Sequence, residues 1–284
     1  MFKKTLKKIA CCVMAALSIT ACAATMTACE TDHPEVKMKL EFNGETYTLE
    51  YKLYRKVAPS TVEHFMWLVE NDYYDGLCVH NYEAGTKMVT GGYTYSAETT
   101  DNGGLTYKPY YETVANYSKF PASVWKDSEK KEATYTLFGE FEDNKFTVEK
   151  GDLDETFGSL TMYYQTKTVD TSVYTKYQKA DKKGETRIVD YKYNSATSLF
   201  YISLEEEAKD NSAYCTFATL KKDSVSTLED LQEAIAEYAD DFVTSVSGVR
   251  VDQDDPFLGE KKTTATFSVP NQPIVIKSVK VTKY

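Results

Sequence analysis

Alternation of polar with aromatic or β-branched residues is the feature that most constrains how this 284-residue chain can fold. Residues 37–42 alternate in this way, residues 46–51 repeat the pattern, and Asn43 and Gly44 lie between the two runs. A period of two residues is typical of strands with one buried face, and Asn-Gly between two such runs favours a tight hairpin. The chain is therefore predicted to be mainly β, with a hairpin near its start and a strand near residues 274–281.

Two segments have the pattern of helices instead. Residues 60–70 begin with Ser60, and Glu63 follows it at the spacing of a capping box. Residues 227–241 have apolar side chains at helical spacing. The apolar faces consist of Val62, Phe65, Met66 and Val69 in the first segment, and of Leu228, Leu231, Ile235 and Tyr238 in the second. One helix is expected in each segment.

Two polar, weakly periodic stretches are expected to be insertions or loops. They cover residues 96–131 and residues 167–193, and the second has the pattern of a hairpin around Lys183 and Gly184. The predicted organisation is a leader over residues 1–28, a tether over residues 29–35, and one domain over residues 36–284 that contains both insertions.

The N-terminus has the features of an export signal. Basic residues up to Lys8 precede an uncharged apolar stretch over residues 9–28. Cys22 ends a small-residue sequence that resembles a bacterial lipobox, and Cys29 is a second candidate, at the point where polar residues begin. Acylation of one of these thiols would anchor the protein to the extracytoplasmic face of a bacterial cell membrane. Ordinary cleavage near Cys22 and retention of the stretch as a transmembrane anchor stay open as alternatives.

Charge, histidine and cysteine content narrow the range of functions. The chain has 33 basic and 43 acidic residues and a net charge of −10, a balance that repels phosphate backbones, so nucleic-acid binding is not expected. The histidines are His33, His64 and His80, and none has a second His or Cys at ligand spacing, so no metal site is expected. Only Cys78 and Cys215 lie in the predicted domain, and the sequence leaves open whether they pair or stay as two buried thiols.

Seven segments, taken in order along the chain, resemble one protein family. Residues 58–76 read APSTVEHFMWLVENDYYDG and are followed by CVHNY at residues 78–82. The later matches are MVTGG at 88–92, LFGEFEDNKF at 137–146, FGSLTM at 157–162, ATSLFYISL at 196–204 and AYCTFATL at 213–220. These segments resemble the cyclophilin-type peptidyl-prolyl cis-trans isomerases. The resemblance implies a closed antiparallel β-barrel of about eight strands, capped by two helices, with a peptide groove on its outside.

The resemblance also implies a chemistry that needs no covalent step and no cofactor. An X-Pro bond isomerises over tens of seconds because amide resonance must be broken. In the family, an arginine donates a hydrogen bond to the prolyl nitrogen as resonance is lost, which stabilises the transition state. In this chain the arginine position is occupied by Asn81, which has no charge and a shorter reach.

Other groove positions implied by the resemblance are also changed. Met88 is retained, and Tyr201 replaces a pocket phenylalanine. The remaining substituted groove positions are Lys87, Thr90, Tyr163, Tyr164, Leu199, Asp210 and Tyr214. Tyr163 and Tyr164 would narrow the groove, and Asp210 in an apolar proline pocket would be costly unless it were solvated or paired.

Three functional hypotheses follow. The first is a protein outside the membrane that binds proline-containing segments of exported polypeptides, with weak or lost isomerase activity. The second is a fully active isomerase that assists the folding of exported proteins, with a donor such as Lys119 or Lys126 in place of the arginine. The third is a non-catalytic envelope interaction protein, in which the barrel is only a scaffold. A separate alternative is a new aromatic surface for a different peptide or a glycan, formed by Tyr163, Tyr164, Tyr201 and Tyr214.

Overall fold

The structure is a computed structural model that describes residues 31–99, 101–144, 153–163, 171–176, 184–191, 196–209, 212–238, 242–255 and 259–284, without the side chains of residues 250–263. The leader with Cys22 lies outside the described residues, as do Cys29, Tyr164 and Asp210. Residues 32–283 form one compact unit. Within the described part of the chain, no helix is both long and apolar enough to cross a membrane.

The predicted N-terminal hairpin is confirmed. β1 (Glu35–Phe42) and β2 (Glu45–Leu53) are antiparallel, and Phe42 lies opposite Glu45 at the turn. Asn43 and Gly44 have φ angles of 50° and 84°, the left-handed values that a two-residue turn between twisted strands requires. Along β1, every second side chain is buried, so the alternating sequence determines which face packs against the core.

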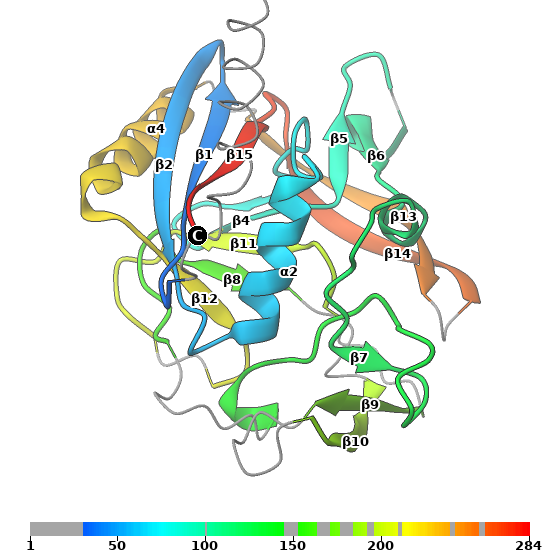
Figure 1. Cartoon of the computed structure of the whole chain (residues 1–284). Coiled ribbons are helices and arrows are strands. Elements are labelled where there is room, and N and C mark those ends of the chain that lie inside the picture. The colour runs from blue at the N-terminus through cyan, green and yellow to red at the C-terminus, as the bar shows by residue number, and fades with distance from the viewer. Residues whose placement is uncertain are drawn as a thin grey trace, which may run out of the picture. The chain divides into compact units, whose positions relative to one another are not determined.

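β1 and β2 belong to an eight-stranded antiparallel sheet with the order β15-β1-β2-β12-β8-β11-β4-β3. The other six strands are β3 (Asn81–Glu83), β4 (Lys87–Thr90), β8 (Leu160–Met162), β11 (Phe200–Ser203), β12 (Thr216–Leu220) and β15 (Val275–Lys283). Figure 1 shows β1, β2 and β15 side by side, with β4, β11, β8 and β12 continuing the sheet behind the helix α2. The C-terminal strand is therefore where the sequence predicts it.

The expectation of a closed barrel is wrong, because the sheet is an open, curled half-barrel with β15 and β3 at its edges. Among the described residues, the edges are joined by the isolated bridge Cys78↔Val275 and by loop hydrogen bonds, such as that from Val79 N–H to Ile274 O at 2.9 Å. In the same stretch, Cys78 N–H donates to Tyr93 O at 2.8 Å. The chain before β3 thus divides its hydrogen bonds between two neighbours, and no continuous ladder closes the sheet.

Both predicted helices form. α2 spans Pro59–Glu70 and α4 spans Val225–Glu237, and a short helix, α3 (Tyr110–Ala115), lies inside the first polar stretch. α4 ends earlier than the sequence predicts, because its C-cap residue Tyr238 has an extended backbone with ψ of 140°.

The predicted capping box at the start of α2 is wrong. The helix begins at Pro59, so Ser60 lies inside the first turn, and the N-cap residue Ala58 has no side-chain cap. Glu140 supplies the acceptors instead: Oε1 accepts from Ser60 N–H at 3.0 Å and Oε2 accepts from Thr61 N–H at 2.9 Å. These two donors belong to the otherwise unsatisfied first turn of the helix. A carboxyl group from a distant segment therefore caps α2.

Aromatic side chains fill the space between α2 and the sheet. The ring of Phe65 lies 5.2 Å from that of Tyr74, 5.6 Å from Phe200 on β11 and 5.1 Å from Phe217 on β12, between centroids. All four side chains are fully buried. Since full burial of such a side chain stabilises a protein by about 1.5–3 kcal/mol, this cluster is a major reason why α2 packs here.

Three smaller antiparallel sheets surround the main sheet. They are β5 (Tyr93–Tyr95) with β6 (Leu105–Tyr107), then β7 (Val124–Trp125) with β9 (Ser172–Lys176) and β10 (Thr186–Asp190), and the long ribbon of β13 (Val243–Asp255) with β14 (Gly259–Pro270). The 3-10 helices are η1 (Asp101–Gly104), η2 (Glu142–Asn144) and η5 (Lys222–Ser224). The β9–β10 pair confirms the predicted hairpin. Whether the two polar stretches are insertions relative to the family stays a prediction.

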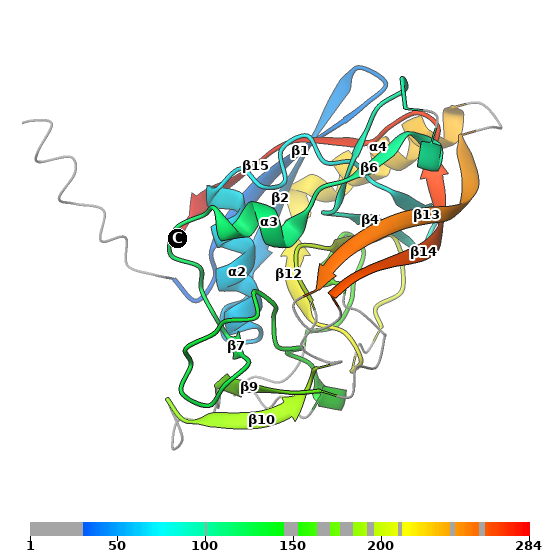
Figure 2. The same cartoon turned by 90° about the vertical axis from the view of Figure 1, so that its right-hand side faces the viewer.

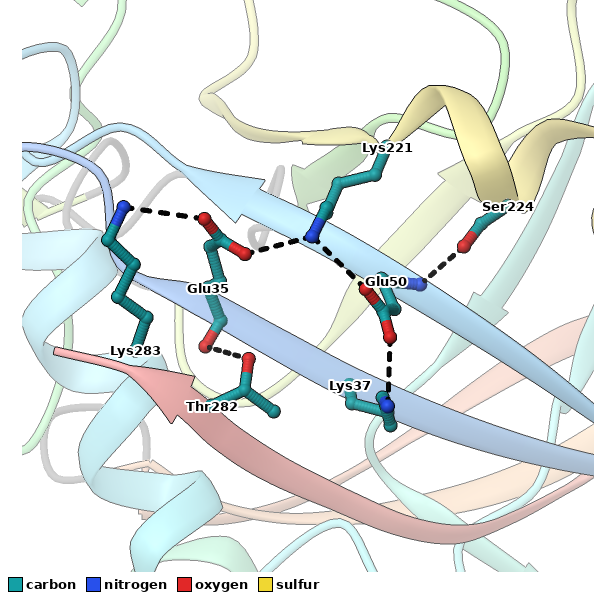
Figure 3. A network of polar contacts seen from close by, with 7 residues as sticks. All are labelled: Glu35, Lys37, Glu50, Lys221, Ser224, Thr282 and Lys283. Carbon is teal, nitrogen blue, oxygen red and sulfur yellow. Dashed lines mark hydrogen bonds and ion pairs between the residues drawn. The ribbon is translucent and has the colours of Figure 1, made fainter.

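An ion network links β1, β2 and β15 to the segment before α4 (Figure 3). Lys221 Nζ lies 2.9 Å from Glu35 Oε2 and 3.1 Å from Glu50 Oε2. Lys37 Nζ lies 2.8 Å from the other oxygen of Glu50, and Lys283 Nζ lies 3.4 Å from the other oxygen of Glu35. Hydrogen bonds from lysines lower the pKa values of both carboxyl groups. The largest effect on Glu35 comes from Lys221, and the largest effect on Glu50 comes from Lys37. The network connects strands that are far apart in the sequence.

Candidate functional site

One row of side chains crosses the main sheet at the position of the predicted groove. The strand registers place the following residues side by side, in this order: Asn81, Val89, Tyr201, Thr161 and Thr216. A hydrogen bond of 3.0 Å between the hydroxyls of Thr161 and Thr216 shows that these two side chains share a face. Because neighbouring residues of a strand point to opposite faces, the adjacent row points the other way.

That adjacent row faces the main core. It contains Tyr82, Met88, Ile202 and Leu160, which all belong to the largest cluster of buried apolar side chains. Met88 is fully buried there. The structure therefore separates Met88 from Asn81 and Tyr201, although the resemblance implies that all three line one groove.

Both ends of the Asn81 amide are occupied. Nδ2 donates to Glu83 Oε1 at 2.9 Å, and Oδ1 accepts a hydrogen bond of 2.8 Å from the backbone N–H of Ser268. Ser268 is on β14, so the ribbon β13–β14 is hydrogen-bonded to the residue at the family's arginine position. Figure 2 shows this ribbon, in orange, running past β4.

Aromatic and apolar contacts hold the same ribbon against the start of β3. The ring of Phe267 lies 4.9 Å from that of His80 and 5.5 Å from that of Tyr93. Val249 and Val269 of the ribbon are buried in the same cluster. Burial lowers the pKa of His80 to about 3, so its ring is neutral near pH 7. The ribbon is thus packed against His80, the residue before Asn81, while Asn81 itself is partly exposed.

Tyr201 is the centre of a second group of predicted site residues. Its hydroxyl donates to Glu155 Oε2 at 2.7 Å, and its ring lies 6.3 Å from that of Tyr214, edge to face. Lys87 Nζ lies 5.9 Å from the centre of the same ring and 3.4 Å from Glu83 Oε2. The structure therefore brings Lys87, Tyr201 and Tyr214 together, as the resemblance implies.

The last three described site residues lie at strand ends. Tyr163 directly follows β8, Leu199 directly precedes β11, and Thr90 is the last residue of β4. Tyr163 N–H donates to Leu199 O at 2.9 Å, and the Tyr163 side chain is 38% exposed. Leu199 lies over Gly92, where an added Cβ would meet Leu199 Cδ2 at 2.6 Å. The Thr90 hydroxyl is buried and donates to Cys78 O at 2.8 Å, so Thr90 has a structural partner.

Sequence reasoning missed Glu155 and Ser268. Glu155 is in no recognisable motif, and Ser268 is 187 residues from Asn81 in the sequence. Of the two lysines considered as replacement donors, Lys126 is paired with Glu132. The only sequence signal for the ribbon is the alternation of β-branched residues near its two ends, which predicts strands but not their partner.

The described residues contain no candidate metal centre, because no group of three or more His, Cys, Asp or Glu side chains among them is placed to hold a metal ion. Cys78 and Cys215 are buried and do not form a disulfide, and burial raises the pKa of Cys78 to about 12. The disulfide that the sequence left open is therefore not formed.

Comparison with known proteins identifies the family. A scan against protein families matches residues 37–252 to "Cyclophilin type peptidyl-prolyl cis-trans isomerase/CLD". Among solved structures, a Cryptosporidium parvum cyclophilin type peptidyl-prolyl cis-trans isomerase is 14% identical, with 89% of this chain and 99% of that chain covered and a TM-score of 0.44. The Mimivirus cyclophilin is also 14% identical, with 89% and 91% covered and a TM-score of 0.43. A search of curated proteins found no match. The family match spans well over half of this chain, which therefore belongs to the cyclophilin-type peptidyl-prolyl cis-trans isomerase family.

Proposed function

We propose that this protein binds extended, proline-containing polypeptide segments and has weak or no isomerase activity. One observation carries the proposal: the Asn81 amide is hydrogen-bonded at both ends, to Glu83 and to Ser268. A donor for the prolyl nitrogen must be free to point at the twisted bond. One of the two N–H groups of the Asn81 amide is engaged by a carboxylate, the amide oxygen is held by Ser268, and the side chain carries no charge, so Asn81 supplies less stabilisation than a free, charged donor does.

The expected loss of rate is large. Removing one donor aimed at the charge or lone pair of a transition state costs about 10²–10³ in rate. Met88, which the family uses to hold the proline ring, is buried in the core. Loss of both the donor and a ring contact supports weak activity at most.

Side chains around Tyr201 remain as a contact surface for a peptide. Lys87, Leu199 and Tyr214 are partly exposed, and Tyr163 is exposed. Tyrosine combines apolar area with a polar tip, which suits an extended chain whose backbone also needs hydrogen-bond partners. These residues support binding without turnover.

The leader supports a location outside the membrane. A basic start, an apolar stretch and the lipobox-like sequence before Cys22 are typical of exported bacterial lipoproteins, and Cys29 is the alternative acylation site. In this proposal, the segments bound are those of exported proteins, and the lipid anchor keeps the protein at the bacterial membrane surface.

A second candidate function is a non-catalytic envelope interaction protein. The packing of Phe267 of β14 against His80 and the hydrogen bond from Ser268 of β14 to Asn81 favour it, because the ribbon then lies beside the position of the family's arginine. The two candidates differ in whether a proline-containing peptide binds at all. A fully active isomerase is the third outcome, and only a rate measurement addresses it.

Peptide titration tests the proposed binding. The chain from residue 30 onward, which contains the compact unit Asp32–Lys283, is added to a short Xaa-Pro peptide, and the chemical shifts of the peptide are followed by NMR. We expect shifts that saturate, and we expect Tyr163→Ala to weaken binding several-fold.

Tyr238 offers a matched control for this titration, since it is 37% exposed on the far end of α4 and Tyr163 is 38% exposed. Tyr238→Ala should leave the affinity unchanged. Absence of peptide shifts with the unmodified protein would reject binding and leave the non-catalytic interaction protein. Equal losses in both variants would reject the surface around Tyr201 as the binding site.

A further inference from the structure

Lysine side chains gather on the outer face of β15, β1 and β2. Along β1 and β2 every second side chain points away from the core, and the register places Lys283 opposite Glu35 and Lys280 opposite Lys37. Figure 3 shows part of this surface, with Lys37 and Lys283 labelled. We call it the lysine face and define it by Lys37, Lys39, Lys52, Lys277, Lys280 and Lys283, with Glu35, Glu41 and Glu50 between them.

The sign of this face is opposite to that of the whole chain, whose net charge is −10. At one margin of the face, Asp75 lies 3.8 Å from Lys280 Nζ, and Asp72 is paired with the same lysine. At the other margin, Lys221 is paired with both Glu35 and Glu50. Lysines outnumber carboxylates by seven to five even when these margins are included, so the rest of the chain carries the net negative charge.

The arrangement of the lysines is not the one that is best for the sheet itself. Lys280 lies directly opposite Lys37, and like charges at opposed positions of neighbouring strands destabilise a sheet. Their carboxylate partners, Asp72 and Glu50, offset part of this repulsion. Lys39, the next outward residue of β1, is exposed and has no ion pair within the described residues. Such a face is complementary to an anionic partner outside the chain.

The chain enters the compact unit at one end of the lysine face. At this end, Lys283 and Lys52 lie on either side of Glu35, the first residue of β1. The unit begins three residues earlier, at Asp32, and Asp32 O accepts a hydrogen bond of 3.1 Å from the backbone N–H of Arg55, just beyond the end of β2. A group attached shortly before Asp32 is therefore held near this face.

The predicted acylation sites lie shortly before Asp32 in the sequence. Cys29 precedes it by three residues and Cys22 by ten. At about 3.3–3.6 Å per residue, these lengths of chain span at most about 11 Å and about 36 Å. Acylation at either cysteine, as proposed above, requires the membrane surface to lie within that distance of Asp32. Among anionic partners, the membrane is the one that the anchor keeps beside the lysine face.

We propose that the lysine face docks on the anionic phospholipid headgroups of the membrane to which the protein is anchored. Lysines close to an anionic bilayer are attracted to it, and the attraction decays over about 8 Å at physiological ionic strength. β12 and β8 separate β2 from β11 in the sheet, so docking uses none of the residues around Tyr201. The proposal goes beyond the location proposed above, and only the choice of a lipid partner rests on that location.

Vesicle sedimentation tests the docking, with the chain from residue 30 onward, which carries no acyl chain. We expect the protein to sediment with vesicles of equal parts phosphatidylglycerol and phosphatidylcholine at low salt, and to stay in solution with phosphatidylcholine alone. Binding should be lost at about 0.5 M salt, because the screening length is then well below 8 Å. These measurements need no variant, so they do not depend on the folding of one.

Charge reversal tests which surface binds. The double variant Lys39→Glu, Lys277→Glu changes the lysine face, where Lys277 is 50% exposed. The double variant Lys131→Glu, Lys209→Glu makes the same change in net charge at two lysines elsewhere, which are 77% and 54% exposed. We expect the first variant to lower partitioning to the anionic vesicles at least tenfold and the second to lower it less than twofold.

Several results would overturn the proposal. They are no binding to anionic vesicles, equal binding to both kinds of vesicle, and equal losses in the two double variants. Binding to soluble polyphosphate as tight as to the vesicles, per phosphate, would overturn the lipid surface as the partner.

Mass spectrometry of the full chain extracted from membranes tests the anchor separately. An acylated chain whose unacylated form ignores anionic vesicles would overturn the docking and leave the anchor in place. A chain without acylation that still binds the vesicles through the lysine face would support the docking and overturn the anchor.

Discussion

Single polar groups in this protein take their roles from residues far away in the sequence. Asn81 stands where the family has an arginine, and its amide holds the backbone of Ser268. Glu140 is a buried carboxyl group whose two oxygens accept from Ser60 and Thr61 at the start of α2. Such groups contribute to stability only while their partners stay in place, because an unpaired buried polar group costs about 1–3 kcal/mol.

Removal of the Asn81 amide should loosen the ribbon. In Asn81→Ala, the N–H of Ser268 loses its acceptor, and we expect its hydrogen exchange to become about tenfold faster, which corresponds to about 1.4 kcal/mol of local stability. Asn81→Asp keeps an acceptor for Ser268 and should protect this amide better than Asn81→Ala does. Native-state hydrogen exchange measured by NMR gives both values, and unchanged exchange in Asn81→Ala would show that the other ribbon contacts suffice.

Glu140 should make stability fall as the pH rises toward neutrality. Burial raises its pKa from an ordinary value of 4.5 to about 7, against the effect of the hydrogen bonds from Thr61 and Ser60. A raised pKa means that the folded state holds the proton more tightly, so the stabilisation is complete below pH 4.5 and is lost as the pH rises through about 7.

The comparison of the unmodified protein with Glu140→Gln isolates this effect. Urea unfolding at several pH values between 5 and 7.5 measures the free energy of unfolding of both proteins. We expect it to decrease with pH in the unmodified protein more steeply than in Glu140→Gln, by up to about 1 kcal/mol per pH unit. Parallel pH profiles would show that Glu140 keeps an ordinary pKa in the folded protein.

At the scale of elements, local sequence patterns predict where strands and helices lie. Asn43-Gly44 and the alternation on both sides of it set the first hairpin, and the apolar spacing of α2 and α4 marks both helices. These signals are carried by residues close together in the chain. The start of α2 could not be predicted in the same way, because its cap, Glu140, comes from a segment about 80 residues away.

The network of Figure 3 shows how strands distant in the sequence are joined, and its effect should depend on pH in the opposite direction to that of Glu140. The pKa values of Glu35 and Glu50 are lowered from 4.5 by hydrogen bonds from Lys221 and Lys37 respectively. A lowered pKa gives stability that is present above pH 4.5 and is lost as the pH falls through the folded-state values.

Lys221→Gln should therefore destabilise the protein at pH 7 and less so at pH 3. Because these side chains are partly exposed, we expect a loss below about 1 kcal/mol at pH 7. Lys39→Gln, at an exposed lysine of β1, is the control and should have no such dependence. Thermal unfolding at the two pH values measures both, and equal losses at pH 3 and pH 7 would contradict an ionic origin.

At the scale of the whole molecule, the order of the seven motif segments predicts the family, and the family match confirms it. The same sequence predicts a closed barrel, whereas the sheet is open, because the chain around Cys78 bonds to both Val275 and Tyr93 instead of completing one ladder. The position of Asn81 could be predicted from its motif. The hydrogen bond between Asn81 and Ser268 of β14 could not, since it depends on packing between segments that share no local pattern.

Weak or absent isomerase activity is the main prediction for this protein, and cis–trans exchange of a short Xaa-Pro peptide measures that activity. Exchange is followed by NMR with the chain from residue 30 onward, beside the Asn81→Arg variant. We expect the unmodified protein to shift the peptide resonances and to leave the exchange rate at or near its uncatalysed value, because Asn81 supplies no charged donor to the prolyl nitrogen. An exchange rate raised tenfold or more by the unmodified protein would contradict this prediction and establish an active isomerase with a different donor.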